Sequence, residues 1–278
     1  MNHIDKELIF TAIVSIAVIT LLAWILRYTT NDTVDMYEYA LTQATSDATL
    51  VVREDRNEDG SNSNYGGFEK GEEKINIDYK GALKSFYNTI FYNLGISTNI
   101  EAKNAFRSHI PIKGVVGYDN IVICTYNDIW LPPESYSYFD KDRDLIYRFT
   151  LGEVVYVYDI NTGTDTKETL DSLIQITTDM TNKQLKNYVV METINKALTK
   201  AASSELNYTS LNLMKGVVFN LVHFDHEVIG GRDIYNSEGN IIDSPGFFAM
   251  IDGIAVGLNS ERIRLASFGG AKMEVINK

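Results

Sequence analysis

The sequence predicts an α+β protein: an N-terminal transmembrane helix extended by a stalk helix, then a globular domain with a mostly antiparallel sheet and a long helix. Three observations predict this architecture. The 19-residue stretch Leu8–Leu26 contains no charged residue, and as a helix it would span roughly 29 Å, about the hydrocarbon thickness of a bilayer. Apolar residues then recur at helical spacing in some segments and at every second position in others. Because these two kinds of segment are grouped and do not alternate as β-α-β units, an antiparallel sheet is expected.

A cleaved signal peptide and a buried core helix are the alternatives for Leu8–Leu26. A signal peptide ends in small residues, whereas this stretch ends in Trp24, Ile25 and Leu26. A core helix is usually amphipathic, and this one is apolar all round. Trp24 and Tyr28 suit the aromatic belt of a membrane interface. We therefore predict that residues 1–30 are a cytoplasmic flank and a single membrane span, with the large domain outside the cell membrane.

Residues 31–53 follow without Pro or Gly and are predicted to form the stalk helix. One face of this helix carries apolar residues at heptad spacing, which is typical of helices that pack against a partner. Two partners are open: the chain's own globular domain, or other subunits of a membrane assembly, including copies of this chain. The alanines in the middle of the face would let either partner approach closely. The predicted interaction face consists of Val34, Tyr37, Leu41, Ala44, Ala48 and Val51.

Residues 54–77 form an acidic segment rich in Gly, Asn and Ser, which predicts an exposed linker. Within it, Asp55, Asn57 and Asp59 alternate before a glycine, as in the first half of a calcium-binding loop. The twelfth position of such a loop supplies a bidentate glutamate, and here it is Gly66. A Ca²⁺ site built on this partial match is one interpretation and a solvated acidic loop is the other; no other cofactor is expected.

Residues 78–278 are predicted to form the extracytoplasmic α+β domain. A helix is expected over Asp78–Gly95, with Asp78 as N-cap, and a second over Asn99–His109. A long helical region is expected from Thr166 to Leu206. Strands are expected where apolar and β-branched residues gather: Lys113–Tyr118, Asn120–Tyr126, Asp144–Thr150, Glu153–Asp159, Gly216–Val222, Arg262–Phe268 and Lys272–Ile276. Phe247–Val256 is a run of mixed character.

The chemistry visible in the sequence argues against several function classes. A net charge of −12 is unfavourable for binding nucleic acid. The single Cys124 excludes an intrachain disulfide and is interpreted as a small buried residue. Motifs of nucleophilic, phosphate-binding or zinc-dependent enzymes are absent, so we expect no enzyme. The cluster His223, Asp225, His226 and Glu227 could supply metal ligands or acid–base groups, but a polar strand end followed by a turn is the simpler interpretation.

The stretch Met36–Ala48, directly after a membrane span, resembles the pseudopilin-like (TadE-like) single-pass proteins of pilus, secretion and conjugation loci. In that family the membrane helix continues into a helix with regularly spaced alanines. The chain departs from the pilin pattern because Glu7 precedes the apolar stretch and no cleavage glycine is recognisable near the N-terminus. Abundant Asn, Ile, Lys and Tyr are typical of low-GC Gram-positive bacteria.

The resemblance implies a minor structural or interaction subunit of such a machinery, with the membrane and other subunits as partners. The alternative is a membrane-tethered sensor or ligand-binding ectodomain. It would use the aromatic loop Trp130–Phe139, which otherwise serves as a lid over a small sheet.

Overall fold

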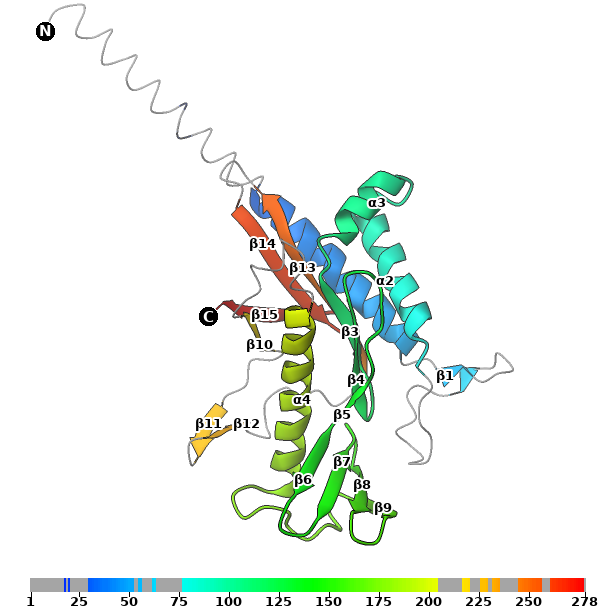
Figure 1. Cartoon of the computed structure of the whole chain (residues 1–278). Helices are drawn as coiled ribbons and strands as arrows, with labels where there is room; N and C mark the ends of the chain where they lie inside the picture. The colour runs from blue at the N-terminus through cyan, green and yellow to red at the C-terminus, as the bar shows by residue number, and fades with distance from the viewer. Residues whose placement is uncertain are drawn as a thin grey trace, which may run out of the picture.

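The chain combines helices with antiparallel sheets, as the α+β prediction requires (Figure 1). The computed structural model describes residues 18, 20, 30–52, 55–56, 62–63, 77–204, 217–220, 226–229, 232–235, 245–256 and 261–277. Residues 30–52 are helical, and three further helices follow: α2 (Tyr79–Asn93), α3 (Ile100–Arg107) and α4 (Asn182–Ser204). Every strand pairing among the described residues is antiparallel.

A seven-stranded sheet forms the centre of the molecule, in the order β10-β15-β14-β13-β3-β4-β5. Its middle strand, β13, comes from the C-terminal part of the chain and pairs with β3, more than 100 residues earlier, in a register that joins Phe248 to Gly114. The predicted strands β10, β15, β14, β3 and β4 are confirmed within a few residues, whereas β13 falls on a run of mixed periodicity and β5 on the predicted aromatic loop. The bounds of the seven strands are β10 (Val217–Asn220), β15 (Ala271–Asn277), β14 (Glu261–Phe268), β13 (Gly246–Val256), β3 (Ile112–Val116), β4 (Asn120–Cys124) and β5 (Glu134–Ser135).

Helices cover both faces of this sheet, so the molecule has three layers. Because side chains alternate along a strand, β13 sends Phe247 and Ile251 to one face and Phe248 to the other. The first face packs against helix 30–52, α2 and α3, and we call this the helix-pair core. The second face packs against α4, and we call this the α4-side core. In Figure 1 α4 lies on one side of the strands, with α2 and α3 on the other.

A four-stranded meander extends the α4-side core. It consists of β6 (Ser137–Asp140), β7 (Leu145–Phe149), β8 (Val154–Asp159) and β9 (Thr164–Thr169). Two small hairpins complete the described strands: β1 (Asp55–Arg56) with β2 (Asn62–Ser63), and β11 (His226–Ile229) with β12 (Arg232–Tyr235).

The predicted long helix from Thr166 is wrong in its first part. Residues 164–169 pair with β8 as an edge strand, where alternating threonines suit the pleated surface. The helix begins only at Asn182. Its start is a capping box: Gln184 N–H donates to Thr181 Oγ1 (3.2 Å), and Thr181 N–H donates to Gln184 Oε1 (2.9 Å).

The two predicted helices α2 and α3 are confirmed, and so is the predicted cap Asp78; Asn99 is the N-cap of α3. The Asp78 carboxylate accepts the N–H of Gly81 (2.8 Å), and the Asn99 side chain accepts the N–H of Ala102 (3.0 Å). These bonds satisfy backbone donors that the first helical turn leaves unpaired. Gly95 follows α2 with φ of +68°, a left-handed conformation that glycine adopts without strain.

Most of the predicted membrane span lies outside the described residues. Within it, Val18 and Thr20 are described, and both are helical and exposed. Among the residues that the structure describes, no helix is long and apolar enough to cross a membrane. The predicted stalk is helical over residues 30–52 and lies against the sheet.

Candidate functional site

The apolar stripe of helix 30–52 contacts the chain's own domain. Leu41, Ala44 and Ala48 are each at most 1% exposed within the helix-pair core. The other three members of the predicted interaction face, Val34, Tyr37 and Val51, are partly buried against the same core. The sequence left two partners open for this stripe, and in the structure it packs against the chain's own domain.

Two threonines on the buried side of this helix set its position on the sheet. Thr45 Oγ1 lies 2.7 Å from Ser267 Oγ, and the Phe247 N–H donates to Thr49 Oγ1 (2.8 Å). These residues are four apart, one helical turn, so they lie on one face of the helix and reach the neighbouring strands β14 and β13. Sequence reasoning missed them because it followed apolar residues only.

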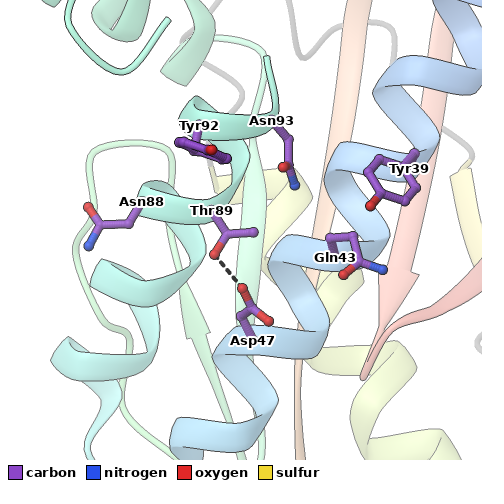
Figure 2. A pocket seen from close by; sticks show the side chains of 7 residues that line it. All are labelled: Tyr39, Gln43, Asp47, Asn88, Thr89, Tyr92 and Asn93. Atoms are coloured by element: carbon purple, nitrogen blue, oxygen red, sulfur yellow. Dashed lines mark hydrogen bonds between the residues drawn. The ribbon is translucent and has the colours of Figure 1, made fainter. Parts of the chain in front are cut away.

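The opposite face of helix 30–52 borders a polar groove, which we call the outer groove. Figure 2 shows its side chains, contributed by this helix and by α2. The cavity measures about 400 Å³, and Thr89 Oγ1 donates to Asp47 Oδ2 across it (2.6 Å). Tyr39 and Tyr92, from the two helices, are 62% and 77% exposed. The other lining residues are Gln43, Asn88 and Asn93.

A second groove lies between α2, α3 and the loop that follows β4, and we call it the cationic groove. Its volume is about 410 Å³. Two cations come from α2 and two from α3, each pair four residues apart and therefore on one face of its helix. The charged and aromatic residues that line the groove are Lys80, Lys84, Lys103, Arg107, Asp128, Tyr87, Phe91 and Trp130.

A buried lysine braces the wall of this groove. Lys113 on β3 is fully buried; its Nζ lies 2.7 Å from Asp128 Oδ1 and donates to Thr125 O (2.8 Å). The same Asp128 oxygen accepts the hydroxyl of Tyr87 (2.9 Å). Asp128 adopts φ of +60°, uncommon for a residue other than glycine. The network ties strand β3, helix α2 and the loop together, which gives the groove a rigid side.

The same neighbourhood suppresses the reactivity of Cys124. Burial raises the pKa of the Cys124 thiol to about 12; the Asp128 carboxylate adds to the rise and the Lys113 ammonium opposes it. Burial, followed by the nearby Asp128 carboxylate, likewise holds the pKa of Tyr87 well above its ordinary value. Neither group is therefore ionised at neutral pH, which leaves Lys113 and Asp128 as the charged pair of the network.

Native Cys124 is expected to resist alkylation. A pKa of about 12 in place of 9.0 leaves roughly a thousandfold less thiolate at pH 8, and the thiolate is the reacting species. Iodoacetamide labelling followed by mass spectrometry should be slow in buffer and fast in urea. A Ser135→Cys variant provides an exposed reference thiol. Equal rates at the two positions in the folded protein would contradict the prediction.

The same pKa difference lowers stability at alkaline pH. Above pH 9 the unfolded chain releases the Cys124 proton, while the folded chain keeps it until about pH 12. The unfolded state is therefore favoured increasingly across this window, by up to about 1.4 kcal/mol per pH unit. Urea unfolding at pH 8 and pH 10 should show a smaller loss of stability for Cys124→Ala than for the unaltered chain.

Most of the other predicted site residues lie outside the described part of the chain. Asp55 lies in β1, but Asn57 and Asp59 are not described, so the calcium prediction stays a prediction. His226 and Glu227 lie in β11, whereas His223 and Asp225 are not described. Among the described residues, no group of three His, Cys, Asp or Glu side chains could hold a metal ion.

The predicted aromatic loop divides. Trp130 lines the cationic groove, whereas Tyr136 is fully buried in the α4-side core and its hydroxyl donates to Asn120 O (2.8 Å). The last part of the predicted loop belongs to strand β6, Ser137–Asp140. Only the first residue of this loop therefore belongs to a candidate binding site.

Comparison with known proteins brings no relative to light. No protein-family model, curated protein or solved structure matched the chain. The resemblance to pseudopilin-like proteins therefore stays a prediction. The outer groove and the cationic groove are the two candidate binding surfaces.

Proposed function

We propose that this chain is a single-pass membrane-anchored protein that acts as a minor interaction subunit of a pilus, secretion or conjugation machinery. The observation that carries the proposal is the two-sided character of helix 30–52. Its inner side is fixed on the sheet, and its outer side, which carries Met36, Tyr39 and Leu50, is exposed. This helix follows the charge-free stretch Leu8–Leu26 after only a few residues.

The buried side supports a rigid link between anchor and domain. Polar bonds from Thr45 and Thr49 hold the helix in one register on β13 and β14, so a domain attached in this way would keep a defined orientation to the membrane. The outer groove then supplies the surface for a neighbouring subunit. Exposed tyrosines are enriched at protein interfaces because they combine apolar area with a polar tip.

Cysteine crosslinking in cells tests this proposal. Variants Tyr39→Cys and Gln43→Cys place a thiol in the outer groove, and oxidation is expected to join them to a neighbouring subunit. Native Cys124 is buried and contributes little background. The protein should also remain in the membrane fraction after washing with carbonate.

Ala44→Cys is the matched control, because this position is on the same helix but fully buried against the sheet. It should stay monomeric. Monomers at Tyr39→Cys and Gln43→Cys alike, or release of the chain by carbonate, would overturn the proposal.

The second candidate function is a membrane-tethered ligand-binding ectodomain. One observation favours it: Trp130 lines a groove together with four cations. A membrane anchor suits both candidates, and Asn88 on α2 is the one lining residue that the two grooves share, so variants at the other positions separate the functions by experiment.

A further inference from the structure

We propose that the cationic groove binds a small phosphate ester that carries a planar ring, the chemistry of a nucleotide. The inference rests on the second candidate function and is independent of the outer groove. It comes from the juxtaposition of four cations from two helices with an aromatic surface in one cavity.

The charge of the groove is opposite to that of the chain. The net charge is −12, yet Lys80, Lys84, Lys103 and Arg107 face one cavity. Within the part of the chain that the structure describes, none of the four forms an ion pair with a carboxylate. Like charges one turn apart destabilise a helix, so these two pairs do not contribute to the stability of α2 and α3. A cleft lined by one sign of charge instead attracts a ligand of the other sign.

The Asp128 carboxylate, which also lines the cationic groove, does not neutralise the four cations. Asp128 Oδ1 accepts hydrogen bonds from Lys113 Nζ and from the Tyr87 hydroxyl, at 2.7 and 2.9 Å. Its charge is therefore balanced by a lysine that is buried and out of reach of solvent. The four cations of the two helices remain for a ligand.

The half-buried Trp130 supplies a surface for a flat ring. It lines the cavity together with Tyr87 and Phe91, which are themselves buried, at 6% and 5% exposed. Trp130 is held by Tyr79, with ring centroids 5.2 Å apart, and the Arg107 guanidinium lies 4.6 Å from the centre of the Tyr87 ring. Bases stack on aromatic rings and on guanidinium planes in this way.

The size of the groove and the net charge select a small ligand. About 410 Å³ lies within the range of small-molecule sites. A phosphate ester brings close to two negative charges and three acceptor oxygens, which match several ammonium groups and one guanidinium. A long polyanion would meet the repulsion of the remaining acidic surface.

Calorimetric titration of the full chain in uncharged detergent tests the inference with three probes: ADP, adenosine and pyrophosphate. ADP is expected to bind at least about tenfold more tightly than adenosine or pyrophosphate, because only ADP combines charge and ring. Lys84→Glu should weaken ADP binding by about tenfold or more. Trp130→Ala should reduce the affinity for ADP toward that for pyrophosphate. Rising salt should weaken ADP and pyrophosphate binding together.

Lys141→Glu is the matched control. It makes the same change of charge in the exposed hairpin between β6 and β7 and should leave ADP binding unchanged. The inference is overturned if ADP does not bind at millimolar concentration, if adenosine or pyrophosphate binds as well as ADP, or if Lys141→Glu weakens binding as much as Lys84→Glu. Crosslinking at the outer groove needs no added nucleotide and no residue of the cationic groove is altered in it, so failure of one proposal is distinguishable from failure of the other.

Discussion

Replacing Lys113 with alanine is expected to lower the free energy of unfolding by about 3 kcal/mol. The ammonium is fully buried, and its removal leaves Asp128 with the Tyr87 hydroxyl and leaves Thr125 O without this donor. Removing one partner of a buried ion pair lowers the free energy of unfolding by about 3–5 kcal/mol, because the other charge stays buried without compensation. The Asp128 side chain is 30% exposed, so solvent reduces the penalty and the lower end of that range applies. Urea unfolding followed by circular dichroism measures the change.

Two further variants separate charge from packing at this position. Lys113→Met keeps most of the side-chain volume and should be less destabilising than alanine. Adding Asp128→Asn to Lys113→Met should recover part of the loss, because the uncompensated carboxylate is gone. The control is the single variant Asp128→Asn. If the double variant loses as much free energy of unfolding as Lys113→Met and Asp128→Asn lose together, the pair is not energetically coupled, and the proposal that it holds the wall of the groove is wrong.

Truncating Phe247 to alanine is expected to be as damaging, at about 3–5 kcal/mol. This side chain is fully buried in the helix-pair core, where its ring lies 5.1 Å from that of Phe86. Its backbone N–H also donates to Thr49 on helix 30–52. A cavity here removes contacts that hold both helix 30–52 and α2 on β13. Thermal and urea unfolding should both report the loss.

A labelling experiment then distinguishes general destabilisation from undocking of the helix. In a Leu41→Cys background, Phe247→Ala should increase the labelling rate of the cysteine well beyond that in the parent, because Leu41 packs in the same core. Tyr92→Ala is the control: its side chain is 77% exposed, so stability should change by less than about 0.5 kcal/mol. Unchanged labelling in the Phe247→Ala variant would mean that the helix is held elsewhere.

Local signals in the sequence predicted most of the elements because those signals act over a few residues. Asp78 is the N-cap of α2 as predicted, and Asn99, where the second helix was predicted to begin, caps α3. The prediction of helix over residues 164–169 is wrong for a local reason. Threonine and charged residues in an edge strand show no apolar period, so the pattern does not reveal the strand. The helix begins after this segment, at the capping box of Thr181.

The candidate sites were harder to predict, because each is assembled from distant segments. Lys80 with Lys84 and Lys103 with Arg107 are visible as pairs in the sequence, but nothing local shows that they face one cavity with Trp130. Lys113 lies in an apolar strand, and its partner Asp128 comes from a loop 15 positions later.

The sequence by itself determined the charge-free stretch of membrane-spanning length, the α+β class, the capped helices α2 and α3, and the presence of an apolar stripe on helix 30–52. Only the tertiary structure decided what covers that stripe and where the cations gather. The physical reason is that periodicity reports which face of an element avoids water, whereas the partner of that face depends on contacts across the sheet. In this chain β13, some 200 residues later, covers the stripe, and the opposite side of the same helix is left exposed.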